Sequence, residues 1–315
     1  NPLSNDSDYD TLKDNWEIEN KRNPAVADYL ISKNFLSACA KDDTGVVCWG
    51  NNDNGQLDVP SLTNLTQLSV GFYHSCALDD TGVVCWGVNM SGQLDVPSLA
   101  NPTQISVGNH HSCALDDTGV VCWGGGWNGQ GDVPSLANPT QISVGTNHTC
   151  ALDDTGVVCW WAVHEPHPKT DNNGRYVIIA APPLANPTQI SVSNNQACAL
   201  DDTGAVCWRY YRVLENEEYV PPHIPEAPPL ANPTQISVGS YHSCALDDTG
   251  VVCWGPNSSG ETDVPSLANP TQISHSCALD DTGVVCWGSN EYGQVNVPNL
   301  LIDPDGDGHS ASDDA

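Results

Sequence analysis

Short apolar runs, each ended by glycine, asparagine or aspartate, fill most of the chain. The clearest copy of this pattern lies between Gln104 and Pro139. Its apolar and β-branched residues predict strands at 103–107, 112–115 and 120–123, with a short fourth strand at Asp132-Val133. Short strands separated by turn residues at this spacing indicate an all-β protein.

The pattern repeats. The phrase HSCALDDTGVVCWG, at His74–Gly87, occurs seven times with small changes, and its first cysteines are 37, 37, 37, 48, 46 and 33 residues apart. A period near 37 residues with four short strands is the size of one propeller blade. The sequence therefore predicts a seven-bladed β-propeller of four-stranded blades at 29–300, an N-terminal leader at 1–28 and a tail at 301–315.

All fourteen cysteines belong to pairs with the same spacing. A strict, even pattern indicates a disulfide framework in an oxidising compartment. Metal binding is the alternative, although it usually needs closer spacing such as C-x2-C. If 79–82 form a loop, Leu78 faces Val83, and Cys76 lies opposite Cys85 at disulfide distance. We therefore expect one intra-blade disulfide per blade: Cys39–Cys48, Cys76–Cys85, Cys113–Cys122, Cys150–Cys159, Cys198–Cys207, Cys244–Cys253 and Cys277–Cys286.

The charge is strongly acidic, with 39 Asp and Glu against 9 Lys and Arg, a net charge of −30. Such a body repels nucleic acid and anionic lipid, and no stretch has the apolar length of a membrane span. Residue 1 is not Met, so we interpret it as a processed or truncated start with any export signal out of view. Together with the disulfides, this composition indicates an extracellular or cell-surface protein.

The repeat also resembles a known one. The pattern V-G-x-x-H-S-C-A-L-D-D-T-G-V-V-C-W-G-x-N-x-x-G-Q-L is similar to the regulator of chromosome condensation (RCC1) repeat, with its G-x-x-H-S turn, D-G hairpin, W-G pair and N-x-x-G-Q-L stretch. In the second copy the matching residues are Gly71, His74, Ser75, Gly82, Trp86, Gly87, Asn89, Gly92, Gln93 and Leu94. The resemblance covers about Tyr29–Asn299 and implies a seven-bladed propeller.

The resemblance is less informative about function, because fold does not imply function. Nuclear members of the family bind chromatin and promote nucleotide exchange on a small GTPase, and neither the paired cysteines nor the charge of this chain suits them. Secreted bacterial members, such as beta-lactamase inhibitory protein type II, bind a partner enzyme with loops on one propeller face. Their branch is the more compatible one.

Repeats four and five break the pattern. The inserts Trp161–Ala181 and Arg209–Ala227 lengthen these units by 11 and 9 residues, and after Lys41 they contain every Lys and Arg. The same loop in adjacent blades emerges at the same edge, so we expect one patch of aromatic residues and Arg, which are common at binding hot spots. The predicted partner-binding residues are Trp161, His164, Lys169, Arg175, Tyr176, Arg209, Tyr210, Tyr211, Arg212 and Tyr219. In the alternative interpretation the inserts form extra strands that pack on themselves, at Val177–Ala180 and Tyr210–Leu214.

Repeated His and Asp residues admit chemical and structural interpretations. A histidine recurs at one repeat position, in His74, His111, His148, His242 and His275. These histidines could ring a metal in the channel, but the blade-to-blade separation favours a local hydrogen bond that holds each turn. The Asp-Asp pairs suit turns, because an active site needs one special copy. His164, Glu165 and His167 form a further cluster that lacks a complete set of metal ligands.

The tail carries the clearest metal motif. Asp303, Asp305 and Asp307 alternate, and Asp314 falls at position twelve, as in a calcium-binding loop. The tail resembles the Asp-rich calcium repeats of thrombospondin type 3, which implies calcium as a cofactor. The alternative is an acidic, disordered end.

Repeat seven is shortened, since Ile273-Ser274 runs directly into His275 and four residues are missing. This predicts either a shortened first strand or a rebuilt turn, and weak ring closure with the leader as a patch.

These observations predict a secreted or surface-displayed propeller that binds a protein or glycan through the loops of blades four and five. A polysaccharide-active enzyme with its site at the channel mouth, and a structural module of a larger surface protein or filament, remain alternatives. No unrepeated carboxylate pair, Ser/His/Asp set or cofactor motif is present, so no catalytic residue is assigned.

Overall fold

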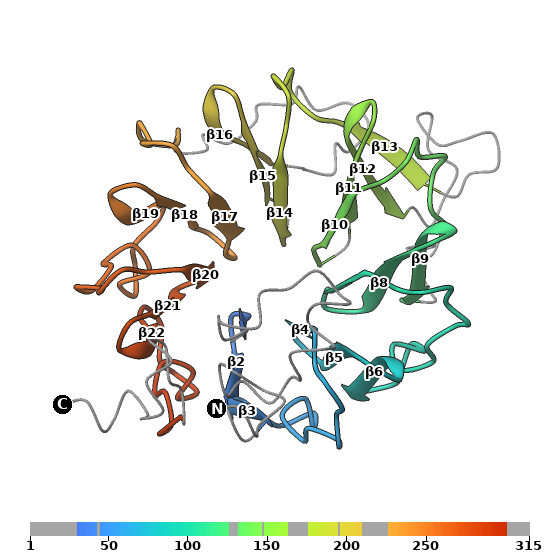
Figure 1. Cartoon of the computed structure of the whole chain (residues 1–315), viewed down its shortest axis with the longest axis horizontal. Helices are drawn as coiled ribbons and strands as arrows, with labels where there is room; N and C mark the ends of the chain where they lie inside the picture. Colours follow the sequence, from blue (N-terminus) through green and yellow to red (C-terminus); the bar gives the residue numbers. More distant parts are fainter. Residues whose placement is uncertain are drawn as a thin grey trace, which may run out of the picture.

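The computed structural model describes residues 30–42, 45–125, 132–146, 148–162, 176–194, 196–209 and 226–300. These residues form 22 strands and no helix. The strands make seven antiparallel sheets, which stand as blades around a common centre (Figure 1). The predicted all-β propeller of seven blades is therefore confirmed.

Each blade follows the chain order from its first strand outward. The blades are β1 (Ile31–Lys33), β2 (Ser37–Asp42) and β3 (Gly45–Gly50); β4 (Gln67–Val70), β5 (His74–Asp79) and β6 (Gly82–Gly87); β7 (Gln104–Val107), β8 (His111–Asp116) and β9 (Gly119–Gly124); β10 (Gln141–Val144), β11 (His148–Asp153), β12 (Gly156–Ala162) and β13 (Tyr176–Ala180); β14 (Gln189–Ser193), β15 (Gln196–Asp201) and β16 (Gly204–Arg209); β17 (Gln235–Val238), β18 (Ser243–Asp247) and β19 (Gly250–Trp254); β20 (Gln272–Ser274), β21 (Cys277–Asp280) and β22 (Gly283–Cys286).

Among the described residues six of the seven blades have three strands instead of the predicted four, and the insert of blade five lies largely outside that part of the chain. The expected fourth strand is the Asp-Val-Pro segment. In blade two the Val96 N–H bonds to the Leu94 carbonyl 3.0 Å away, within its own loop, and Pro97 has no N–H to donate. Blade four has a fourth strand because its insert supplies β13, whose Ile178 lies opposite Trp160 of β12. The self-packing alternative is thus confirmed for Val177–Ala180, whereas Tyr210–Leu214 lies outside the described residues.

The predicted hairpin register is confirmed. Leu78 pairs with Val83 and Cys76 with Cys85, and the ladder continues to Asp79 opposite Gly82, so the turn itself is shorter than the expected four residues. Gly82 adopts a φ of 108°, which side chains other than hydrogen rarely allow. All seven predicted disulfides form within their blades, with Cα–Cα distances of 4.0–4.1 Å. Each closes a small loop and stabilises its blade by at most about 2–3 kcal/mol.

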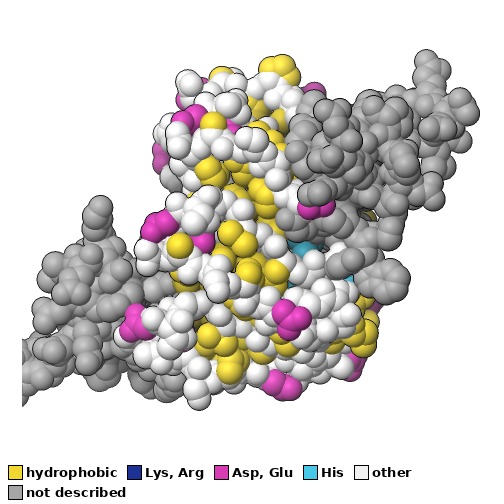
Figure 2. All heavy atoms as spheres, turned by 90° about the vertical axis from the view of Figure 1, so that its right-hand side faces the viewer, with side chains coloured by type: hydrophobic (Ala, Val, Ile, Leu, Met, Phe, Trp, Pro, Cys, Tyr) yellow, Lys and Arg dark blue, Asp and Glu magenta, His cyan; other side chains and the backbone are white. Residues whose placement is uncertain are grey.

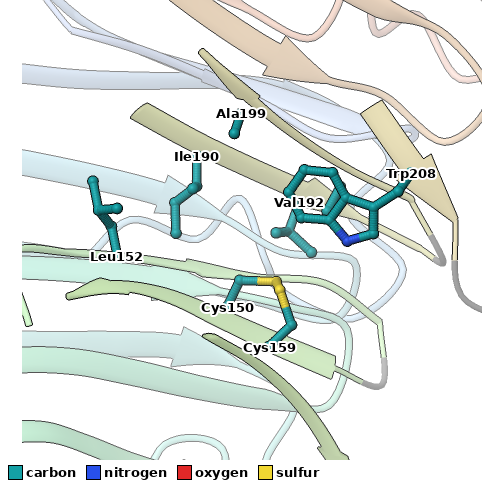
Figure 3. Packing of buried hydrophobic residues seen from close by; sticks show 8 residues of the cluster. Cys150, Leu152, Cys159, Ile190, Val192, Ala199 and Trp208 are labelled. Atoms are coloured by element: carbon teal, nitrogen blue, oxygen red, sulfur yellow. A yellow bond between two sulfur atoms is a disulfide. The ribbon is translucent and has the colours of Figure 1, made fainter. Parts of the chain in front are cut away.

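The core lies between neighbouring blades. Figure 3 shows the packing of blade four on blade five, where the Cys150–Cys159 disulfide and Leu152 meet Ile190, Val192 and Trp208. Equivalent clusters recur at the other junctions. The second strand of each regular blade is buried at nearly every position, because it has a strand on both sides and a blade against both faces. Each large apolar side chain buried in this way contributes about 1.5–3 kcal/mol.

Polar bonds repeat at the same junctions and use the Gln-Ile-Ser part of the first strand. Gln67 Oε1 accepts the Ile105 N–H at 2.7 Å, and Ser69 Oγ accepts the Val107 N–H at 3.0 Å. The same two bonds join blades three to four, four to five and five to six. At the junction of blades one and two the serine bond remains, from the Val70 N–H to Ser32 Oγ, but Leu30 stands in place of the glutamine.

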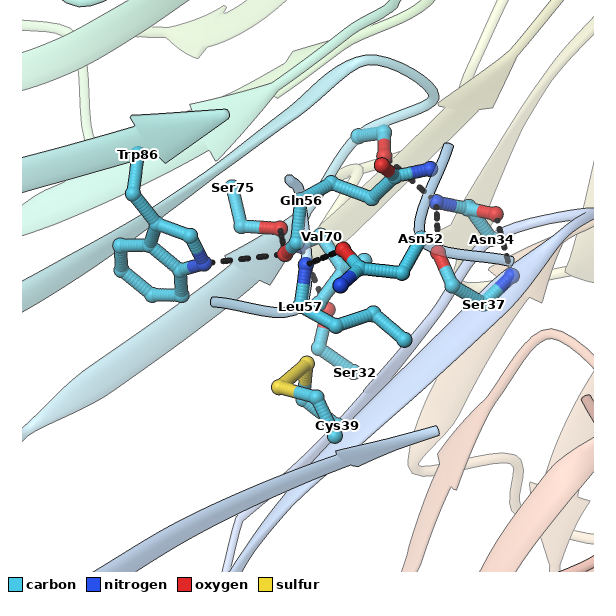
Figure 4. The surroundings of a disulfide bond; sticks show 12 residues. Ser32, Asn34, Ser37, Cys39, Asn52, Gln56, Leu57, Val70, Ser75 and Trp86 are labelled. Carbon is cyan, nitrogen blue, oxygen red and sulfur yellow. Dashed lines mark hydrogen bonds between the residues drawn. A yellow bond between two sulfur atoms is a disulfide. The ribbon is translucent and has the colours of Figure 1, made fainter. Parts of the chain in front are cut away.

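The prediction of weak ring closure is wrong. Blade seven joins blade one through the standard pair, since the Ile31 N–H bonds to Gln272 Oε1 at 2.7 Å and the Lys33 N–H to Ser274 Oγ at 2.9 Å. Trp49 Nε1 also donates to the Gln294 carbonyl at 3.1 Å, as Trp86 does to Gln56 between blades one and two (Figure 4). Closure is strong because the joint needs only the inner strand, which repeat seven keeps.

The shortened first strand of blade seven is confirmed. β20 has three residues, and its Ser274 pairs with Cys277, so His275 and Ser276 alone form the turn. The His275 N–H bonds to Ser237 Oγ at 2.7 Å, which is the bond that a valine makes at other junctions. His275 has a φ of 55°, in the left-handed region that residues other than glycine adopt uncommonly.

Candidate binding face

The two edges of the ring differ, because successive turns of an antiparallel sheet lie at opposite ends of its strands. One edge carries the turns between second and third strands, such as Asp80-Thr81, and we call it the hairpin face. The other edge carries the turns between first and second strands and the loops after the third strands, and we call it the loop face. Contact between these loops is close, since the Val88 N–H bonds to the Tyr73 carbonyl at 3.0 Å.

Both inserts begin on the loop face. β12 brings Trp161 opposite His148, and β16 brings Arg209 opposite Gln196. Blades four and five are neighbours, joined from Gln141 Oε1 to the Ile190 N–H at 2.8 Å. The two loops therefore leave adjacent blades at the same edge. Of the predicted binding residues, Trp161 and Tyr176 have described backbones in β12 and β13.

Arg209 is the one predicted binding residue whose side chain is described. Its Nε and Nη2 donate to Gln196 Oε1 at 3.1 and 3.0 Å, and Gln196 Nε2 donates to Ser243 Oγ of the next blade at 2.7 Å. The structure thus ties the half-buried guanidinium to the junction of blades five and six at the base of the second insert. The remaining predictions lie outside the described residues: His164, Lys169, Arg175, Tyr210, Tyr211, Arg212 and Tyr219 for the partner, and Asp303, Asp305, Asp307 and Asp314 for calcium.

Two of the repeated histidines, His74 and His111, join neighbouring blades instead of holding a turn of their own blade. His74 Nε2 shares a hydrogen bond with Ser112 Oγ at 2.7 Å, and His111 Nε2 with Thr149 Oγ1 at 2.9 Å. Both side chains are fully buried. Burial lowers the pKa of His74, His111 and His148 to about 3, so these imidazoles are neutral at pH 7. His164, Glu165 and His167 lie outside the described residues.

The Asp-Asp pairs build turns, as predicted. Asp116 Oδ2 accepts the Ala100 N–H at 2.7 Å, while Oδ1 accepts the N–H and hydroxyl of Thr118 at 2.7 and 2.6 Å. Burial alone would raise the pKa of Asp116, but these bonds and one from the Gly119 backbone outweigh it and lower the pKa. The second aspartate, Asp117, accepts from Asn101 Nδ2 at 2.6 Å. The pair therefore fixes the hairpin to the link that enters the blade.

Sequence reasoning missed several aromatic and apolar residues on the loop face. The rings of Tyr73 and His110, in neighbouring blades, have centroids 5.2 Å apart, and Phe72 packs edge-on against Tyr73 at 4.7 Å. Met90, Tyr241 and Tyr292 are 87, 59 and 45 % exposed. All of them occupy the variable positions of the G-x-x-H turn or the N-x-x-G loop. Comparing the copies at those positions would have found them.

The described surface carries few cations. In the side view of Figure 2, Asp and Glu side chains are spread over the ring and no Lys or Arg side chain is visible. Across the described ranges no three His, Cys, Asp or Glu side chains could hold one metal ion. Nor does any helix in that part of the chain have the length and apolarity to cross a membrane.

Comparison with known proteins identifies the repeat. The sequence model of the regulator of chromosome condensation (RCC1) repeat matches residues 65–93, 234–261 and 274–294. No curated protein matches the chain in sequence. Three stretches of the seven-bladed ring thus match the RCC1 repeat that the sequence pattern resembles.

Solved structures show the same fold. Human WBSCR16 has 20% identity and a TM-score of 0.60, covering 78% of this chain and 83% of its own. The ectodomain of the Physcomitrella patens receptor kinase CR4 has 21% identity and a TM-score of 0.59, with 83% and 72% covered. Prp20p from Saccharomyces cerevisiae has 17% identity and a TM-score of 0.56, with 75% and 74% covered. At these identities the likeness concerns the fold alone.

Proposed function

We propose that this propeller is a protein-binding module that engages its partner through the loop face. The observation that carries the proposal is the place where the repeats differ. The hairpin face repeats one set of bonds, while the loop face carries both inserts, on adjacent blades, and the exposed Tyr241, Met90 and Tyr292. Aromatic residues and Arg concentrate binding energy at interfaces, and loops on a rigid scaffold are where binding usually resides.

Proteins of the same fold support a protein partner. Prp20p is described for its binding to Gsp1p and histones, and CR4 is the ectodomain of a receptor kinase. Our proposal takes from them only the class of partner. The acidic body of this chain disfavours nucleic acid, because it would repel phosphates.

The proposal places the protein outside the cell or at its surface, in a secreted branch of these propellers. Seven disulfides and no free cysteine among the described residues support an oxidising compartment. Within the proposal, the insert residues named above supply the contacts, and the Asp-rich tail binds calcium through Asp303, Asp305, Asp307 and Asp314.

The test replaces both inserts. Residues 161–181 and 209–227 are each exchanged for the ten-residue sequence Gly87–Val96 of blade two. Surface-protein extract of the source organism is cross-linked through a photoreactive amino acid at Tyr241 on the loop face, or at Thr118 on the hairpin face. We expect one partner protein to cross-link from Tyr241 and to be lost from the replaced chain, since interface hot spots usually cost more than tenfold in affinity.

A matched control exchanges Gly124–Val133 of blade three for the same Gly87–Val96 sequence, which has equal length. This variant should keep the partner. Cross-linking from Thr118 instead of Tyr241, or an unchanged yield after both inserts are replaced, would refute the proposal. Binding of a glycan instead of a protein would refute the protein partner proposed here and favour the other class of partner that the sequence predicted.

A further inference from the structure

The loop face is interrupted at blade seven. In the regular blades the turns between first and second strands stack on one another so closely that a Cβ atom on Gly71 would clash with the Gly108 carbonyl. Blade seven has only His275 and Ser276 in this turn. The stack of turns is therefore broken between blade six and blade one.

Three residues around this short turn depart from the repeat. Lys33 of blade one stands where other blades have valine, His275 takes the valine place of blade seven, and Glu261 of blade six replaces a glutamine. The glutamine has a clear role elsewhere: Gln294 Nε2 donates to the Phe35 carbonyl, 3.2 Å away in the turn of the next blade. Blade seven has no such turn, so a side-chain amide at position 261 of blade six would have no carbonyl there to which it could donate.

The three departures meet His242 of blade six, and we call the four residues the seam cluster: Lys33, His242, Glu261 and His275. The rings of His242 and His275 have centroids 6.0 Å apart and are nearly perpendicular, at 82°. Burial lowers the pKa of Lys33 to about 8, against the opposing influence of Glu261. Burial and then Lys33 lower the pKa of His242 to about 4. The four groups are thus near enough to influence one another's charge.

The seam cluster has unused hydrogen-bonding capacity. His242 is 5 % exposed, and its Nε2 has no hydrogen-bond partner among the described residues. Its ring also bonds to the backbone of His275, which leaves Nε2 as the nitrogen that can take up a proton. Lys33 is 8 % exposed, and its Nζ donates to the Asn34 carbonyl at 3.2 Å. An ammonium group has three hydrogens, so Lys33 can donate further. His74 and His111 also have one ring nitrogen without a partner, so the feature that distinguishes His242 is the nearby charge of Lys33.

The charges favour an anion over a metal ion. No three acidic, cysteine or histidine side chains of the described chain can hold one metal, and the Lys33 ammonium would repel a cation. We propose that the seam cluster binds a single carboxylate group together with one proton, with Lys33 as the charge partner and His242 Nε2–H as the second donor. Hydrogen bonds between a cation and a carboxylate are among the strongest in proteins. Glu261, whose Oε2 accepts the Ser259 N–H at 2.8 Å, opposes the ligand electrostatically and limits its affinity.

The experiment is a titration of the full chain with sodium acetate at constant ionic strength, followed by the imidazole NMR signals of His242 and His275. Sodium chloride serves as the anion control. A ligand this small should bind with a dissociation constant of about 1–50 mM at pH 6. The linked proton should weaken binding about tenfold on going from pH 6 to pH 7, because the neutral His242 must gain a proton, whereas Lys33 stays largely charged and His275 stays neutral.

Variants that restore the repeat sequence test each role. Lys33→Val should weaken acetate binding at least about tenfold, because it removes the charge that attracts the carboxylate. Glu261→Gln should strengthen acetate binding several-fold, because it removes a charge that repels the carboxylate. His242→Gln should remove the linked proton, and blade five tolerates glutamine there as Gln196. The control Lys41→Leu restores the repeat at a distant buried lysine and should change nothing.

Several outcomes would overturn the assignment. They are equal shifts with chloride, unchanged binding in Lys33→Val, weaker binding in Glu261→Gln, or binding of zinc in place of acetate. Tetraglycine with a free C-terminal carboxylate, compared with its amidated form, distinguishes a peptide carboxylate from a free acid. The chain with both inserts replaced should still bind acetate, so this proposal and the proposed function fail separately.

Discussion

The hairpin face and the loop face are made by the same seven repeats, yet they are built on opposite rules. On the hairpin face every regular blade uses the same aspartate bonds, such as those from Asp116 and Asp153 to the entering link and the turn threonine. On the loop face almost every blade differs, from Phe72-Tyr73 to the short turn at His275. The hairpin face fixes the ring, and the loop face varies because its outer side chains take no part in the repeated bonds.

Acid should remove the stabilising contributions of the two faces at different pH values, and this is the largest expected effect on the free energy of unfolding. His74, His111 and His148 lie beneath the loop face with pKa values of about 3, against about 6.5 when unfolded. As the pH falls, the histidines take up protons in the unfolded chain before they do so in the folded one. The contribution of the buried, neutral imidazoles to stability is therefore complete above pH 6.5 and is lost at lower pH. At pH 4.5 each histidine should destabilise the fold by about 2–3 kcal/mol, and the three together by roughly 8 kcal/mol. Urea unfolding between pH 7 and 4.5 measures this loss.

The hairpin face should respond later to acid. Its aspartates, including Asp116, Asp153, Asp201 and Asp247, have pKa values lowered from 3.8, so their contribution is lost only at lower pH.

His111→Gln is the control for the histidine effect, since Gln196 already occupies that position in blade five. It should reduce the loss of stability between pH 6.5 and 4.5 by about one third, and an unchanged slope would mean that burial of the imidazoles is not the cause.

The second prediction compares one aspartate from each face. Asp116→Ala should destabilise the fold by about 2–3 kcal/mol, because the buried carboxylate leaves the N–H groups of Ala100 and Thr118 without their acceptor. Asp263→Ala on the loop side should cost less than about 1 kcal/mol, since its exposed carboxylate accepts one bond from Asn257. Chemical denaturation measures both values. Equal losses would remove the distinction between a fixed face and a variable one.

The third prediction concerns the joint between blades, where the expected effect is smaller than that of Asp116→Ala. Gln104→Leu removes the acceptor for the Ile142 N–H, a bond of 2.7 Å, and should cost about 1 kcal/mol. The chain tolerates this change at its first repeat, where Leu30 occupies the same place. Thermal unfolding of the variant beside Gln67→Leu, at the neighbouring joint, should give similar losses. A loss several times larger would mean that the glutamine bond contributes most of the stability of a joint. The joint of blades one and two, which keeps only the serine bond, would then be weak.

Features that depend on repetition alone could be predicted from the sequence. The spacing of Cys76 and Cys85 determined the register of the hairpin and the disulfide, because only one pairing places both cysteines opposite each other. It could not reveal that His74 bonds to Ser112 of the next blade, since that contact depends on how two blades pack. The fourth strand was wrongly predicted because Val96 bonds within its own loop and Pro97 has no N–H to donate to a neighbouring strand. The seam cluster was hidden because Lys33 is far from Glu261 and His275 in the chain and meets them only when the ring closes.

The glutamine and serine joint has a consequence for how such a chain can arise. One flank of a unit supplies acceptor side chains and the other flank supplies the N–H groups that they accept. Any copy of the gene segment therefore fits head to tail against its parent without a compensating mutation. Because the first and last copies meet by the same joint, duplication can lengthen the chain one unit at a time, and the curvature of the stack decides when it becomes a circle.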